Sequence, residues 1–287
     1  MNRSLLSRQC LLVGVLAFLI ILLLSATTLA SEGLPSRLTV DFGFDESGAQ
    51  SRTLDMDYAL TPKLRLALSA SEYENSDYRS ELHYIALASD PLAPVQLVLG
   101  YERWDSDGEF RVDTLNLLIG FNTEQWSLSI NPIRRDIAIN FINPRRSIKE
   151  VTFTATGLTI SLGYFMVNGF QLGLRYSEYD YSENVARLDP QRSPSIIRFI
   201  SPIALSQAQG LDDHNYYLDL GYPFEWLFLN MTLGQSQSAV DGSDSDLLVI
   251  NSYIPLTDDW ELAVGAGRQT LEGNAITFSN LGLSLYW

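Results

Sequence analysis

Beyond residue 35 the sequence repeatedly places an apolar residue at every second position, over stretches of about ten residues. The clearest stretches are Leu38 to Phe44, Leu54 to Leu60, Leu64 to Leu68, Val95 to Tyr101, Leu115 to Phe121, Trp126 to Ile130, Leu158 to Tyr164, Phe170 to Tyr176, Tyr216 to Tyr222, Leu227 to Leu233, Trp260 to Ala266 and Leu281 to Trp287. Residues 79–89 and 246–254 alternate less cleanly. A period of two predicts strands that have one apolar and one polar face.

The connections between these stretches alternate between short turns, such as 61–63 and 223–225, and longer polar loops. The longest loop runs from about residue 178 to residue 211. Sequential hairpins of this kind predict an all-β fold, a closed antiparallel transmembrane β-barrel of about 12–14 strands. Residues 126–164 fit either one long protruding hairpin or two shorter ones, and Gly157 looks like a bulge. A soluble β-sandwich, which also has a period of two, is the alternative.

The N-terminus has the features of a secretory signal peptide, residues 1–30. Two arginines precede an apolar run from Leu11 to Leu24, and small residues follow as far as Ala30. Cleavage after Ala30 leaves residues 31–287 as the barrel and removes Cys10, the one cysteine of the chain. The alternative is an uncleaved membrane anchor, because the apolar segment is almost unbroken and just long enough to span a bilayer.

The end of the chain and its aromatic residues carry a resemblance to a known class. The last stretch alternates and ends on an aromatic residue, Trp287, which resembles the C-terminal signal recognised by the outer-membrane assembly machinery. Aromatic residues also lie near predicted strand ends, where barrels have interfacial girdles. With the export signal, these features make residues 36–287 resemble the porin-like outer-membrane β-barrels of Gram-negative bacteria. The resemblance implies location in the cell outer membrane, contact with its lipid and lipopolysaccharide, and the assembly machinery as a partner during biogenesis.

If the apolar face of each strand contacts lipid, the polar face lines the lumen. The charged residues predicted to face the lumen are Asp41, Asp55, Asp57, Arg65, Glu81, His83, Glu102, Arg175, Asp219 and Glu261. A charge on the lipid face would cost about 2–4 kcal/mol near the midplane, which favours the lumen for these residues. Because carboxylates predominate, an open lumen predicts passive or weakly selective passage of small hydrophilic solutes, neutral or cationic. The alternative is a closed lumen whose carboxylates are paired.

Two further features concern the loops. The long loop contains the apolar residues Ile196, Ile197 and Phe199, so we expect it to fold into the barrel as a constriction or to cap its mouth. A basic cluster consists of Arg134, Arg135, Arg145, Arg146 and Lys149. Guanidinium groups bind phosphate bidentately, so this cluster is a candidate contact for lipopolysaccharide phosphates. A non-conducting surface barrel, whose loops bind lipopolysaccharide or an external partner, is therefore the alternative to a channel.

The remaining chemistry is limited. A formal charge of −15 argues against nucleic acid as a partner, and the sequence has no phosphate-binding loop, clustered metal-ligand motif or cofactor motif. The nearest approach to a catalytic arrangement is Asp212 with His214 and Asp55 with Asp57, which resembles the paired residues of the omptin surface proteases. We predict that the protein is not an enzyme, and a surface hydrolase is the third hypothesis.

Overall fold

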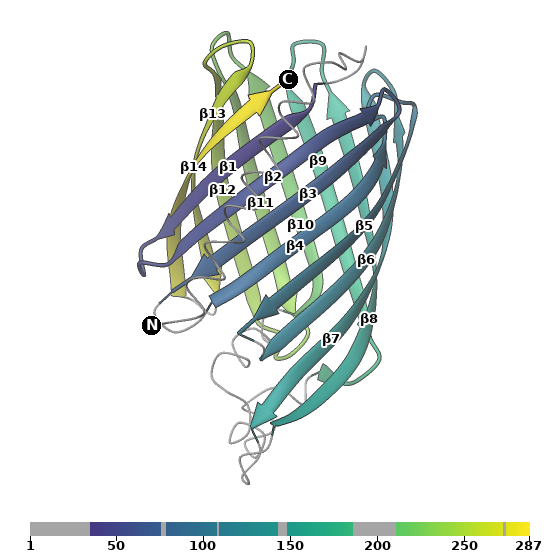
Figure 1. Ribbon diagram of the computed structural model, residues 1–287, viewed down its shortest axis with the longest axis vertical. Coiled ribbons are helices and arrows are strands. Elements are labelled where there is room, and N and C mark those ends of the chain that lie inside the picture. The colour runs from purple at the N-terminus through teal and green to yellow at the C-terminus, as the bar shows by residue number, and fades with distance from the viewer. Residues whose placement is uncertain (1–34, 76–78, 108, 143–147, 186–210, 272–273) are drawn as a thin grey trace, which may run out of the picture.

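The computed structural model describes residues 35–75, 79–107, 109–142, 148–185, 211–271 and 274–287. In these residues the chain forms a closed barrel of fourteen antiparallel strands (Figure 1). The strands are β1 (Arg37–Asp45), β2 (Gln50–Thr61), β3 (Leu64–Glu74), β4 (Arg79–Ser89), β5 (Val95–Ser106), β6 (Phe110–Asn122), β7 (Trp126–Ile142), β8 (Ile148–Phe165), β9 (Gln171–Tyr181), β10 (Asp212–Pro223), β11 (Phe228–Ser238), β12 (Asp244–Pro255), β13 (Trp260–Leu271) and β14 (Asn274–Tyr286). The predicted barrel is confirmed, with the larger of the two strand counts.

Each strand pairs with its neighbours in the sequence, and β1 closes the barrel against β14. The hydrogen bonds that close the barrel extend to the last residue. The Ser36 amide donates to the Trp287 carbonyl at 2.9 Å, and the Trp287 amide donates to the Ser36 carbonyl at 3.1 Å. We call this end of the barrel the termini end. The opposite end, which carries the connection between β9 and β10, is the long-loop end.

Alternation along the strands separates two faces. One outward row across β3 to β6 consists of the registered leucines Leu66, Leu87, Leu99 and Leu117. The adjacent inward row consists of Ala67, Ala86, Gly100 and Asn116. Leu87, Leu99 and Leu117 are each more than 40% exposed, and many other large apolar side chains share this outer face. A soluble protein rarely exposes such a continuous apolar surface, whereas lipid would cover it.

The strands β7 and β8 are the longest, with 17 and 18 residues, and they project beyond their neighbours at the long-loop end (Figure 1). Their pairing is continuous from Trp126 with Tyr164 to Ile142 with Ile148, so residues 126–164 form one long hairpin. The register passes through Gly157 without a shift on either side, so the expected bulge at this residue is wrong.

The connections differ from the sequence prediction. The sequence predicted short turns at one end of the barrel and longer loops at the other. The connections at the long-loop end, however, include the short segments 46–49 and 239–243, so the difference in loop length between the two ends depends mainly on residues 182–211. Among the described residues, no helix has both the length and the hydropathy to cross a bilayer. The predicted signal peptide and the apolar loop residues Ile196, Ile197 and Phe199 lie outside the described residues.

Candidate functional site

The inward face of the barrel carries most of the charged residues that the sequence predicted for the lumen. Strand alternation and register place eight of them there: Asp41, Asp55, Asp57, Arg65, Glu102, Arg175, Asp219 and Glu261. Two of them form an ion pair, because the Arg65 Nε lies 2.8 Å from the Asp57 carboxylate. Arg65 also donates a hydrogen bond to the Pro35 carbonyl. Glu261 accepts a hydrogen bond from the Tyr286 hydroxyl at 3.1 Å. The lumen wall therefore combines paired carboxylates with others that face the interior.

Glu81 and His83 were predicted in the lumen, and the structure places them on the outer face instead. They alternate in phase with the outward residues Ile85 and Leu87 of β4, and His83 is registered with Ala70 of β3. Glu81 lies 2.8 Å from Arg79 at the long-loop end of the strand. The error arose because small and apolar residues occupy both faces of β4, which hides the phase of the alternation.

Arg135 was predicted to contact lipopolysaccharide, yet its register with Thr114 and Ala155 turns it into the lumen. Its guanidinium group lies 4.0 Å from the centre of the Tyr179 ring and donates to the Tyr179 hydroxyl at 2.9 Å. Arg134 points outward and lies 3.6 Å from Asp136. Arg145, Arg146 and the side chain of Lys149 lie outside the described part of the chain.

Gly157 provides the space in which the Tyr179 ring lies. A Cβ atom at this position would meet the Tyr179 ring at 2.5 Å and the Glu178 carbonyl oxygen at 3.0 Å. We therefore expect Gly157→Ala to destabilise the barrel by about 1–3 kcal/mol, the usual cost of overpacking. The measurement is the unfolding temperature of the refolded barrel in detergent. Gly120→Ala is the matched control, because its Cβ would meet the Gln96 side chain no closer than 3.2 Å; equal losses in both variants would contradict this role of Gly157.

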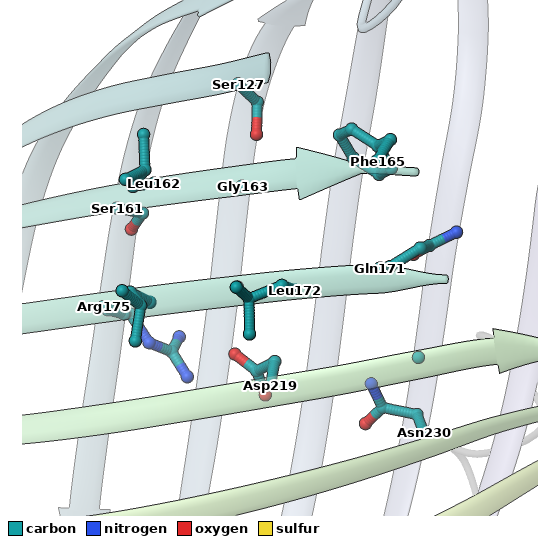
Figure 2. Close-up of a pocket in the computed structure, with 13 residues that line it drawn as sticks. Ser127, Ser161, Leu162, Gly163, Phe165, Gln171, Leu172, Arg175, Asp219 and Asn230 are labelled. Atoms are coloured by element: carbon teal, nitrogen blue, oxygen red, sulfur yellow. The ribbon is translucent and has the colours of Figure 1, made fainter. Parts of the chain in front are cut away.

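A hollow of about 270 Å³ is set into the inner wall at the termini end of β7 to β11 (Figure 2). Its floor contains three glycines, because Gly163 and Gly173 are registered partners and Gly221 follows on the next strand. Its polar lining consists of Ser127, Ser161, Gln171, Arg175, Asp219 and Asn230. The sequence identified Arg175 and Asp219 as lumen charges. The glycines and amides were missed, and the signal that could have found them is their inward phase on these strands.

The two charges of this hollow are held by neighbours on adjacent strands. The Arg175 guanidinium lies 4.5 Å from the centre of the Tyr217 ring, and Asp219 accepts a hydrogen bond from the Thr232 hydroxyl at 2.6 Å. Arg175 is registered with Tyr217, two residues from Asp219, so both side chains project from the same face. These two described side chains form no ion pair with each other at 4.0 Å or less. Both charges are thus positioned without neutralising each other directly.

A buried apolar cluster lies at the long-loop end, on the inner faces of β6, β7 and β8 and on adjoining loop residues, and we call it the apolar lid. Its members are Phe110, Val112, Ile137, Ile139, Phe153, Ala155, Val185, Leu211 and Val240. The members on β6, β7 and β8 are inward-facing, yet Phe110 and Ile139 are 0% exposed. Trp104 packs edge-on against Phe110, with ring centres 5.1 Å apart. An inward side chain of an empty barrel would contact water, whereas these side chains pack against other members of the cluster, which include Val185, Leu211 and Val240 outside the strands.

The residues of the hydrolase hypothesis do not converge. Asp55 and Asp57 face the lumen from β2, whereas His214 is on the outer face of β10 and packs against Tyr216 at 5.4 Å between ring centres. His214 pairs with the adjacent Asp213 at 3.1 Å. Across the described ranges, no three His, Cys, Asp or Glu side chains are grouped so that they could hold a metal ion.

Several solved structures are similar in fold. The CymD monoaromatic hydrocarbon channel is 8% identical with a TM-score of 0.52, covering 90% of this chain and 89% of that chain. The outer-membrane expressed OmpT of Vibrio cholerae is 9% identical with a TM-score of 0.50, covering 88% and 97%. The KdgM porin in complex with disordered oligogalacturonate is 9% identical with a TM-score of 0.45, covering 88% and 99%. No family model and no curated protein matches the sequence. The likeness shows the fold, a closed barrel of the outer-membrane type.

Proposed function

We propose that this outer-membrane β-barrel is a channel for small hydrophilic solutes, neutral or cationic. The observation that carries the proposal is the separation of its two faces, with exposed leucines outside and polar and charged side chains inside. Fourteen strands also lie between barrels of about 8 strands, whose side chains fill the interior, and porins of about 16–18 strands, which hold an aqueous channel. A polar wall around an interior of this width supports passage of water-soluble molecules.

The charges on the inner wall support a preference for cations. Asp41 and Asp55 lie on the neighbouring strands β1 and β2, and Asp55 and Asp57 follow each other on the same face. Arg65 offsets Asp57, and Arg37 shares the inner face of β1 with Asp41, whereas Arg135 and Arg175 lie on the more distant strands β7 and β9. Carboxylates that line a permeation path raise the local concentration of cations and lower that of anions.

The test is single-channel recording of refolded residues 31–287 in a planar bilayer with a potassium chloride gradient. We expect stable current steps and a reversal potential that favours potassium over chloride. Asp41→Asn with Asp55→Asn should shift the reversal potential toward zero while the barrel remains folded. A folded barrel that passes no current under any voltage would contradict the proposal, and a chloride preference would contradict its cationic part.

A second candidate is a non-conducting surface barrel, whose loops bind lipopolysaccharide or another external partner. The apolar lid favours this candidate, because inward-facing side chains at the long-loop end are fully buried instead of lining an open path. Arg134 is the described member of the basic cluster that faces outward, and its contact with lipopolysaccharide stays a prediction. The same recording separates the two candidates, because this second function requires a folded and silent barrel.

A further inference from the structure

We propose that the hollow around Arg175 and Asp219 is a binding site for a neutral polyhydroxylated solute, namely a single sugar ring. This inference rests on the proposed channel, because it names the solute class that the lumen would hold. The hollow is distinct from the apolar lid, since it lies at the opposite end of the inner wall on β7 to β11.

The size of the hollow suits a small ligand. Gly163, Gly173 and Gly221 have no side chains of their own, and they leave room for the polar side chains of the lining to lie against the wall. A Cβ at Gly163 would meet the Ser127 hydroxyl, and one at Gly173 would meet Asp219 at 3.2 Å. A volume of about 270 Å³ is close to the lower end of the range of about 300–1,000 Å³ for ligand pockets. This size fits one ring and not an oligomer.

The chemistry of the lining selects a neutral ligand with many hydroxyl groups. The Arg175 guanidinium only donates hydrogen bonds and the Asp219 carboxylate only accepts them, so the pair adds no net charge to the hollow. Gln171 and Asn230 each offer both a donor and an acceptor, and the serine hydroxyls do the same. A simple ion would satisfy one charge and be repelled by the other. A ring with several adjacent hydroxyls can use both charges and the amides together.

The edges of the hollow complete the fit. Figure 2 shows Phe165 at one side of the floor, with Gln171 nearby and with Arg175 and Asp219 at the other side. An aromatic ring provides a surface for the C–H groups of a sugar, which hydroxyl-binding side chains leave uncovered. Tyr217, against which Arg175 packs, restricts the guanidinium to the inner wall. The lining therefore offers apolar and polar surfaces to opposite parts of one ring.

The test compares three probes on the open channel: glucose as a neutral polyol, glycine as a zwitterion and gluconate as an anionic polyol. Of the three probes, we expect glucose and neither of the others to cause a saturable fall in the potassium current. Asp219→Asn and Asn230→Ala should each weaken the apparent affinity for glucose about tenfold, the effect of losing one good hydrogen bond to a bound ligand. Asp55→Asn is the matched control: it removes a lumen carboxylate outside the hollow, so glucose block should persist although cation preference falls.

Calorimetry with the same refolded chain in detergent keeps this inference separate from the channel proposal. Glucose binding that depends on Asp219, in a barrel that passes no current, would support the site and overturn the channel. A conducting barrel that glucose neither blocks nor binds would overturn the site and leave the channel standing. Stronger block by glycine or gluconate than by glucose would also overturn it, since a charged ligand would then be preferred.

Discussion

Leu117→Arg is expected to prevent stable insertion of the barrel into a bilayer. Leu117 is 41% exposed on the outer face of β6 and is registered with Leu99 of β5 within the apolar row. An arginine on the lipid face near the midplane costs about 2–4 kcal/mol, a large part of the stability of a typical domain. The measurement is the fraction of folded chain after refolding into lipid vesicles, read as resistance of the barrel to added protease.

The control lies one residue away. Asn116 is registered with Gly100 and faces the lumen, so Asn116→Arg puts the same charge on the same strand but into a polar interior. We expect Asn116→Arg to insert close to the wild-type level and to reduce cation preference instead. Equal losses in the two variants would show that the two faces of β6 are not exposed to lipid and lumen as assigned.

The alternation of side chains predicted the barrel because it is a local property that every strand repeats. It gave the right face for Asp41, whose strand alternates strictly, and for Glu102, because Leu97, Leu99 and Tyr101 fix the outer face of β5 beside it. It failed for Glu81 and His83, because β4 carries Leu82 and small alanines on its inner face and the phase cannot be read from polarity. Strand phase is thus predictable only where one face is consistently polar.

Arg135 shows a different limit of sequence reasoning. Its neighbours suggested a basic loop, but the phase set by Ser127 and Ser129 continues along β7 and turns Arg135 inward. Two basic residues in succession must occupy opposite faces of a strand, so Arg134 and Arg135 could not both face outward once residues 126–142 formed one strand. The misassignment therefore followed from underestimating the length of the hairpin.

The hollow could not be predicted from sequence, because it depends on register between strands far apart in the chain. Ser127, Arg175 and Asn230 come from β7, β9 and β11, and nothing in their local sequence indicates that they share one level of the barrel. The pairing of Gly163 with Gly173, which puts two glycines side by side in the floor, is fixed only by how β8 and β9 align. Local periodicity predicts faces, whereas a site requires the relative heights of several strands.

Phe110→Ala is expected to open the apolar lid and raise the single-channel conductance. Phe110 is 0% exposed and contacts Trp104 within a cluster that covers the inner wall at the long-loop end. Truncating a buried phenylalanine usually costs about 3–5 kcal/mol, partly because it leaves a cavity. In a lumen next to water, that cavity can be hydrated and widen the path past Ile137 and Ile139. We therefore expect larger current steps together with a lower unfolding temperature.

Phe42→Ala makes the same chemical change on the outer face of β1, where Phe42 is 45% exposed. It should alter contact with lipid and leave the conductance at the wild-type value, so a difference between the two variants reports on the lumen alone. If Phe110→Ala lowers the unfolding temperature without changing conductance, the apolar lid stabilises the long hairpin and does not lie on the permeation path. A lid on the permeation path and a lid that only stabilises the hairpin both predict a less stable variant. Conductance, and not stability, therefore distinguishes the two roles.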